Sequence, residues 1–206
     1  MLQNRVDPKG NIIKTSARGL WMGNRGQLHN EQQNLVRSFK LKAWITCLLE
    51  FNSRKRKVMS PNRYTELFFL DEATAFAAGH RPCFECRRED YKRFKNCWLK
   101  GNHEYGFDTR TSIREIDRIL HEERINTKNE KLTYQDNPEN LPDGTFILFR
   151  NQPYLIDKKY IHGWSPFGYE KSKALPKLGK VSVLTPKSIV IAFGAGYRPQ
   201  MDVEKK

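Results

Sequence analysis

The feature that most constrains this sequence is a pair of cysteines, Cys83 and Cys86, separated by two residues. Two thiolates at this spacing can bind one metal ion, the first from a loop and the second from the start of a helix. A helix start also lowers the pKa of a thiol, which favours metal binding. The pair therefore predicts a zinc site, with buried structural thiols as the alternative.

Zinc takes four ligands, so this pair needs partners from other parts of the chain. Cys47 lies in an apolar segment and can approach from a separate element. Cys97 is a poor third ligand, because a continuous helix would place it about 16 Å beyond Cys86. The predicted ligands are Cys47, Cys83 and Cys86. The spacing does not choose a fourth ligand among His29, His80 and His103.

Apolar patterning predicts an α+β fold in which β-rich N- and C-terminal parts flank a helical middle, in a single compact domain over residues 1–206. Residues 43–51 read as a buried strand, with residues 58–59 as its antiparallel partner. Asp71 is placed to cap a short helix that ends before Gly79.

Further signals follow in the second half of the chain. Pro82 suits the first turn of the next helix, and Ser112 with Glu115 forms a capping box for another. Residues 126–140 read as a long polar loop. The predicted strands beyond it are 145–149, 154–156, 181–184 and 188–193.

The charge of the chain points to a polyanionic partner. Lys and Arg number 37 against 23 Asp and Glu, which gives a net charge of +14. This balance favours DNA, or alternatively RNA, over a small apolar substrate. Basic residues alternate with aromatic ones, which suits a phosphate backbone and stacked bases. The candidate nucleic-acid-binding residues are Arg18, Trp21, Arg25, Arg54, Lys55, Arg56, Lys57, Tyr64, Arg81, Arg87 and Arg88.

Residues 17–29 form the best candidate for an active loop, because their glycines let the backbone approach a ligand closely. In this segment Asn24 can read a base edge, and His29 can act as an acid, a base or a ligand. The alternative is a glycine-rich structural loop around a core tryptophan.

Two carboxylates close to the basic segments are candidate catalytic groups. Glu66 and Asp71 could activate water or stabilise a sugar cation as a base leaves. The alternatives are a surface salt bridge for Glu66 and a simple N-cap for Asp71. The candidate catalytic set is thus Glu66, Asp71, Asn24 and His29.

The segment from Leu67-Phe68-Phe69 through Glu72-Ala73-Thr74-Ala75 to Ala78-Gly79-His80-Arg81-Pro82-Cys83-Phe84-Glu85-Cys86-Arg87 resembles the second half of the Ada-type metal-binding domain. The resemblance covers about residues 67–87. It implies a cysteine-bound structural zinc and a surface that faces the DNA backbone, with residues 1–125 as the DNA-binding part and 141–200 as a β-rich C-terminal part.

The family repairs methyl phosphotriesters by transferring the methyl group to a zinc-bound cysteine. Its first ligand pair is C-x-x-x-C, but the position four residues after Cys47 is Phe51. The resemblance therefore extends to the scaffold and the DNA preference, and not to the methyl-transfer reaction.

The sequence predicts a zinc-stabilised protein that acts on modified or damaged DNA, with base removal of the DNA glycosylase kind as the leading reaction. One alternative is a non-catalytic regulator that binds DNA or RNA. Another is a zinc-dependent nucleobase deaminase, because His29-x-Glu31 and Pro82-Cys83-x-x-Cys86 match the two halves of that signature.

No nucleotide-cofactor motif is evident. No apolar run reaches the roughly 18–20 residues of a membrane span, and the N-terminal residues show no secretory signal. The expected location is cytoplasmic and nucleoid-associated.

Overall fold

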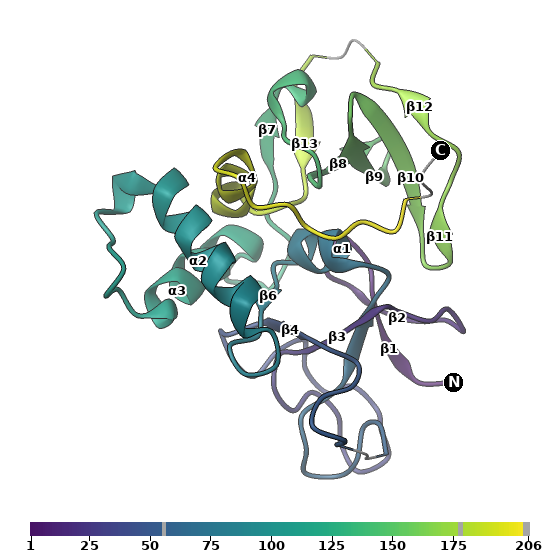
Figure 1. The fold of residues 1–206 in the computed structure, drawn as a ribbon. Helices are drawn as coiled ribbons and strands as arrows, with labels where there is room; N and C mark the ends of the chain where they lie inside the picture. Colours follow the sequence, from purple (N-terminus) through teal and green to yellow (C-terminus); the bar gives the residue numbers. More distant parts are fainter. Residues whose placement is uncertain (55–56, 177–178, 204–206) are drawn as a thin grey trace.

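The computed structural model describes residues 1–54, 57–176 and 179–203. Over these residues the chain forms two β-sheets and four α-helices, which confirms the predicted α+β class (Figure 1). The predicted cations Lys55 and Arg56 lie outside the described residues.

The first sheet is built mostly from the N-terminal part and has the strand order β2-β1-β5-β3-β4-β6. Its strands are β1 (Gln3–Val6), β2 (Ile12–Lys14), β3 (Trp21–Asn24), β4 (Ile45–Cys47), β5 (Leu67–Phe69) and β6 (Arg81–Pro82). β3 runs antiparallel to both of its neighbours, β5 and β4, whereas β6 is parallel to β4. Segments far apart in the sequence thus meet at β3 and β4.

The second sheet is C-terminal and has the order β11-β10-β9-β8-β13-β7, with β12 paired to β10. Its strands are β7 (Tyr134–Asp136), β8 (Phe146–Phe149), β9 (Gln152–Asp157), β10 (Tyr160–Ser165), β11 (Gly168–Tyr169), β12 (Lys173–Ala174) and β13 (Val181–Val183). The two-residue turns at 150–151 and 158–159 have positive φ throughout. Such turns match the twist of the antiparallel strands they join.

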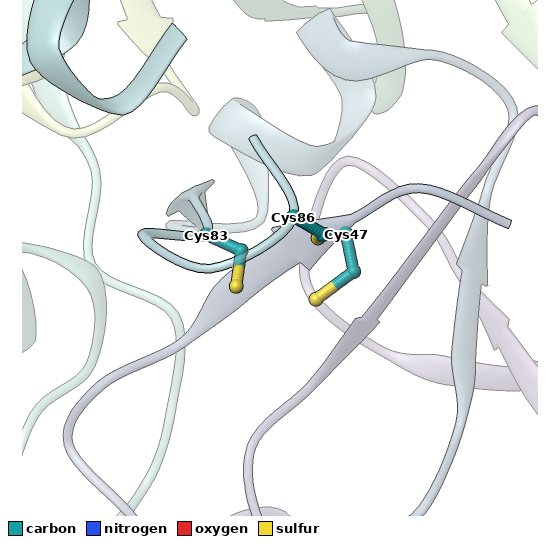
Figure 2. A group of neighbouring side chains, drawn as sticks. All are labelled: Cys47, Cys83 and Cys86. Carbon is teal, nitrogen blue, oxygen red and sulfur yellow. The ribbon is translucent and has the colours of Figure 1, made fainter. Parts of the chain in front are cut away.

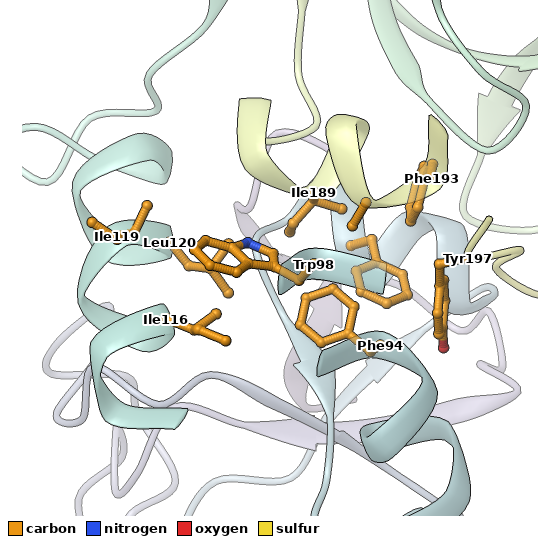
Figure 3. Close-up of a cluster of buried hydrophobic side chains, with 10 residues drawn as sticks. Phe94, Trp98, Ile116, Ile119, Leu120, Ile189, Phe193 and Tyr197 are labelled. Carbon is orange, nitrogen blue, oxygen red and sulfur yellow. The ribbon is translucent and has the colours of Figure 1, made fainter. Parts of the chain in front are cut away.

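The helices pack together beside the two sheets. They are α1 (Glu72–Ala77), α2 (Arg88–Gly101), α3 (Ile113–Arg124) and α4 (Lys187–Gly194), with 3-10 turns η1 (His103–Tyr105) and η2 (Pro138–Asn140). Figure 3 shows their shared core, in which Trp98 of α2 lies among Leu120 of α3 and Ile189 of α4. Ala73 and Ala77 of α1 also pack against Phe146 and Leu155 of the second sheet.

Both predicted helix caps are present. The carboxylate of Asp71 accepts a hydrogen bond from the Thr74 backbone N–H at 2.8 Å, and the Ser112 hydroxyl accepts one from Arg114 at 3.3 Å. Gly79 follows α1 with φ +86°. Its lack of a side chain is also needed for packing, because a Cβ there would lie 2.5 Å from Cδ of Arg124.

The strand predicted over 43–51 is shorter than expected, and residues 58–59 are not its partner. β4 ends at Cys47 because β6, its outer neighbour, contributes only two residues to the ladder. Leu48 and Leu49 then leave the sheet and are exposed. The antiparallel partner of β4 is β3.

Pro82 does not begin a helix, contrary to the prediction. It lies in the edge strand β6, where a missing N–H leaves no ladder bond unmade. The helix begins six residues later, at Arg88.

The segment 188–193 is helical rather than extended. Its apolar run cannot by itself distinguish a buried strand from a buried helix. Ile189 and Phe193 of α4 pack on the helical core, while Val190 packs on the second sheet, so the helix is buried on two sides. The stretch predicted as a loop over 126–140 contains β7 and η2.

Candidate metal centre

Three predicted zinc ligands meet at one end of the first sheet. Cys47 is the last residue of β4, and Cys83 directly follows β6, the parallel neighbour of β4. The Cys83 backbone N–H donates to the Thr46 carbonyl at 2.8 Å, so the sheet ladder itself places the two cysteines side by side. The sheet thereby joins residues that are 36 positions apart in the sequence.

A tight turn brings in the third cysteine. The Arg87 backbone N–H donates to the Cys83 carbonyl at 3.2 Å, and the Glu85 N–H donates to the Cys83 sulfur at 3.4 Å. The turn places Cys86 beside the other two just before α2 begins, and the three sulfurs lie within 4.8 Å of one another (Figure 2).

This donor set fits zinc. Tetrahedral zinc with bonds of about 2.3 Å to sulfur holds thiolates about 3.8 Å apart, so only a small contraction of the cluster is needed. Burial at Cys47 and Cys83 also suits a bound ion. Within the described parts of the chain, no other group of three or more His, Cys, Asp or Glu side chains brings its ligand atoms together in this way.

The three thiols already act on one another electrostatically. Hydrogen bonds from Cys47 and Cys86 to its sulfur lower the pKa of Cys83. Hydrogen bonding with Cys83 and Cys86, followed by burial, raises the pKa of Cys47. A proton shared among clustered thiols is what a cation replaces when it binds, because metal ligands must be deprotonated.

The cluster forms part of the wall of a pocket of about 300 Å³. Strand register explains what else faces it. Met22 pairs with both Cys47 and Phe68, and side chains two residues away on each strand, at Asn24, Ile45 and Glu66, point to the same side. These six side chains line the pocket together.

Glu66 and Asn24 are the two predicted catalytic residues that the structure brings to the cysteines. Glu66 is 3% exposed, and its carboxylate accepts a hydrogen bond from the Met59 backbone N–H at 2.8 Å. The Asn24 side-chain oxygen accepts one from the Gly26 N–H at 3.2 Å. Tyr64 and Arg54, two predicted nucleic-acid-binding residues, line the same pocket.

The other two predicted catalytic residues lie elsewhere. Asp71 is fully buried as the cap of α1, where it also accepts a hydrogen bond from the Tyr169 hydroxyl at 2.7 Å. His29 is buried, with Nδ1 2.6 Å from the Thr65 hydroxyl and Nε2 3.2 Å from the Ser60 carbonyl. The structure thus places His29 away from the zinc ligands, and the deaminase signature that relied on it is not assembled.

Three of the predicted nucleic-acid-binding arginines are interior residues rather than surface contacts. Arg81 makes a two-pronged ion pair with Asp117, with both contacts at 2.7 Å. Arg87 pairs with Glu72 and Asp90 and stacks on Trp21, with its guanidinium carbon 3.9 Å from the ring centroid. Arg25 is 1% exposed. The sequence predicted surface positions for these arginines because it does not show which distant residues contact them in the interior, such as Asp117 for Arg81 and Glu72 for Arg87.

Trp21 belongs to the opposite face of β3 from the pocket, since it alternates with Met22. Its indole N–H donates to the Gln200 side chain at 2.8 Å. Arg18, Arg54, Lys57 and Arg88 are exposed as expected. Arg54 also forms an ion pair with Glu85, which lies between the two cysteines of the pair.

Sequence reasoning missed the apolar part of the pocket, namely Met22, Phe68 and the exposed Leu48 and Leu49. The alternation from Glu66 to Phe68 would have placed those two side chains on one face. The pairing of β5 with β3, and through β3 with β4, could not be read from the sequence, because β3 ends at Asn24, far from β5 along the chain.

Comparisons of this sequence and fold with protein-family models, curated proteins and solved structures found no match. Among the described helices, none combines the length and apolar character needed to cross a membrane.

Proposed function

We propose that the protein is a zinc-dependent, DNA-binding enzyme that acts on a modified or damaged base, removing it by hydrolysis of the glycosidic bond. The observation that carries this proposal is the meeting of three cysteines, Glu66 and Asn24 on the wall of one pocket. Three of these five residues are ligand candidates, and the other two carry polar groups suited to chemistry on a base.

Cys47, Cys83 and Cys86 would hold the metal. A zinc ion held by these three thiolates would supply Lewis-acid chemistry to a water or a substrate atom in the pocket. The same ligation would lock β4 and the turn before α2 together, since those elements provide the thiols.

The roles of the other residues follow from their chemistry. The Glu66 carboxylate can take a proton from the attacking water, or stabilise positive charge on the sugar as the base departs. The Asn24 amide can hydrogen-bond a base edge. Tyr64 offers a ring on which an extruded base can stack.

Support for a DNA substrate comes from charge and from the resemblance to the Ada-type domain. The chain carries a net charge of +14. Arg54 lines the pocket, and Arg88 follows Cys86 closely, with its guanidinium 5.2 Å from the ring of exposed Phe84. Exposed cations beside a pocket can bind the phosphates that flank an extruded nucleotide.

The test is incubation of the zinc-loaded protein with DNA duplexes that carry a panel of modified bases, followed by alkali. Base removal leaves sites at which alkali breaks the strand. We expect Glu66→Gln to abolish breakage with little effect on folding, because glutamine retains an acceptor for Met59. Glu89→Gln, at an exposed ion pair on α2, serves as the matched control and should cleave normally. Intact DNA across the panel would refute base removal.

A second candidate is zinc-dependent deamination of a base. It is favoured by a specific observation, the presence of Glu66 in the pocket of a three-cysteine cluster, because some deaminases combine a Cys₃ zinc site with a glutamate that transfers protons. Conversion of cytosine or adenine in single strands, without loss of the base, identifies this activity. Tight, salt-sensitive binding with no turnover of either kind identifies a regulator instead.

A further inference from the structure

A second and larger cavity, of about 660 Å³, lies on the other side of the first sheet. Asn24 and Ile45 face the cysteine pocket, while their chain neighbours Arg25 and Trp44 line this cavity. Successive residues of an extended chain point to opposite faces, so the two cavities share no lining residue. The volume falls within the range of small-molecule binding sites, about 300–1,000 Å³.

Cationic groups dominate the polar lining of this cavity. Arg25 and Arg124 are each 1% exposed, and each guanidinium carbon lies 3.8 Å from a ring centroid of Trp44. Lys131 and Lys9 are half-buried, and Arg37 is exposed at the rim. The deepest part of the cavity is therefore built from two arginines held against one tryptophan.

Neither buried arginine has a carboxylate partner among the described residues. Arg25 donates to the Gly10 carbonyl at 3.1 Å and to Nε2 of His80 at 3.3 Å. Arg124 donates to the Gly79 carbonyl at 2.9 Å and the Lys42 carbonyl at 2.6 Å, and one of its nitrogens lies 2.8 Å from Nδ1 of His121. The Nη2 of Arg25 and the Nε of Arg124 have no hydrogen-bond partner in the described chain.

Two other buried arginines, Arg81 and Arg87, do have carboxylate partners. Arg81 and Arg87 are also about 4% exposed, and each makes an ion pair with a buried carboxylate, Asp117 and Glu72 respectively. A buried charge without a partner costs several kcal/mol. An anion bound from solution would supply the charge that Arg25 and Arg124 lack.

Few acidic groups oppose an anion here. Glu130 is the one carboxylate on the lining of this cavity; it is exposed and accepts a hydrogen bond from Asn126 at 2.8 Å. Asp7 acts on Arg25 and Lys131 through space, but its carboxylate is hydrogen-bonded by Asn11. Burial, followed by the neighbouring Arg25 and Arg124, lowers the pKa of Lys131 to about 7.

We propose that this cavity binds a phosphate monoester carried by a ligand of about nucleotide size. Two buried guanidiniums and Lys131 match the charge of a phosphate dianion better than that of a single carboxylate, and arginine forks bind phosphate oxygens in pairs. The apolar part of the lining, which includes Ile12, Leu35 and Ile125, would cover the organic part of the ligand. The proposal does not depend on the function proposed for the cysteine pocket.

Calorimetry on the full chain tests it with four probes: inorganic phosphate, a nucleoside monophosphate, a 5′-phosphorylated oligonucleotide and its 5′-hydroxyl counterpart. We expect the phosphorylated probes to bind and the 5′-hydroxyl oligonucleotide to bind at least tenfold more weakly. Binding of the free nucleotide alone identifies a small-molecule ligand, and preference for the phosphorylated oligonucleotide identifies a strand end. The proposal is overturned if the nucleoside monophosphate does not bind and the two oligonucleotides bind with equal affinity.

Variants locate the site. Lys131→Met should weaken nucleoside monophosphate binding at least tenfold, whereas Lys128→Met, an exposed lysine of the same loop that does not line the cavity, should change it less than twofold. Arg37→Gln changes an exposed residue on the rim, so it should weaken nucleoside monophosphate binding without disturbing the core. Unchanged affinity in both Lys131→Met and Arg37→Gln overturns the proposal.

Discussion

The two faces of the first sheet carry ionisable side chains of opposite kinds: thiols and a carboxyl group on one face, arginines and a lysine on the other. One face gathers three thiols and the carboxyl group of Glu66, and this arrangement suits a cation. The other gathers Arg25 and Arg124 against Trp44, with Lys131 on the same cavity, and this arrangement suits an anion. A sheet of short strands can carry both because adjacent side chains point in opposite directions. The comparison teaches that net charge alone says little about where a ligand binds.

The largest expected effect tests whether the cysteine face binds a metal ion. Cys83→Ser removes a central ligand and should reduce bound zinc from one ion per chain to none, measured by native mass spectrometry. Because metal binding is coupled to folding, the variant should also unfold at a markedly lower temperature. Cys97→Ser is the matched control, since Cys97 packs beside the helical core rather than in the cluster. A zinc-free native protein would leave the three thiols as packing groups.

The next effect compares a paired with an unpaired buried cation. Asp117→Ala should lower the free energy of unfolding by about 3–5 kcal/mol, because Arg81 is left buried without its partner. Lys131→Met removes a cation that has no carboxylate partner, so in phosphate-free buffer it should be near neutral or stabilising. Denaturant titration measures both values. A loss of equal size in the two variants would break the comparison.

A smaller effect concerns pH and the anion-binding face. The pKa of Lys131 is about 7 in the folded chain and about 10.5 when unfolded. Between these values the unfolded state binds more protons, so stability rises with pH by at most about 1.4 kcal/mol per unit. Lys131→Met should flatten this slope in denaturant titrations from pH 7 to 10. The same deprotonation should weaken phosphate binding above pH 7, and affinity that rises with pH would contradict the assignment.

The smallest effect is expected at the rim of the cysteine pocket. Arg54 and Glu85 form an ion pair with both side chains more than half exposed. Such pairs are screened by solvent, so Arg54→Gln should leave the thermal unfolding midpoint unchanged within error. If Arg54 contacts DNA phosphate, the same variant should weaken DNA binding and reduce its dependence on salt. Unchanged DNA binding would remove Arg54 from the proposed interface.

Local signals in the sequence predicted local structure well. The spacing of Cys83 and Cys86, the cap at Asp71 and the N-cap at Ser112 each depend on residues within four positions of one another, and each is present. The return bond from the Glu115 side chain that completes a capping box is not seen among the described residues, because Glu115 pairs with Arg118. The α+β class followed from the same kind of pattern. Pro82 and residues 188–193 were assigned wrongly because a neighbour distant in sequence, β4 or the second sheet, decides their conformation.

For the two sites, too, the sequence indicated which residue types are present but not which distant residues they meet. Cys47 could be proposed as a ligand from its type, but its position beside Cys83 depends on the parallel pairing of β4 with β6. Arg25 and Arg81 look alike in the sequence, and only the structure shows that one faces a cavity and the other faces Asp117, 36 residues away. The identity of a charged residue is local information, whereas the group that neutralises it is not.

Because side chains alternate along β3, both pockets depend on the same register of β3 against β4 and β5. If the strand slid by one position against β4 and β5, Arg25 would point toward the thiols and Asn24 would point toward Trp44. A one-residue insertion or deletion between Trp21 and Arg25 would thus repel a metal ion on one side and unbalance the arginine cluster on the other. The length of this short segment therefore cannot change without altering both proposed binding surfaces at once.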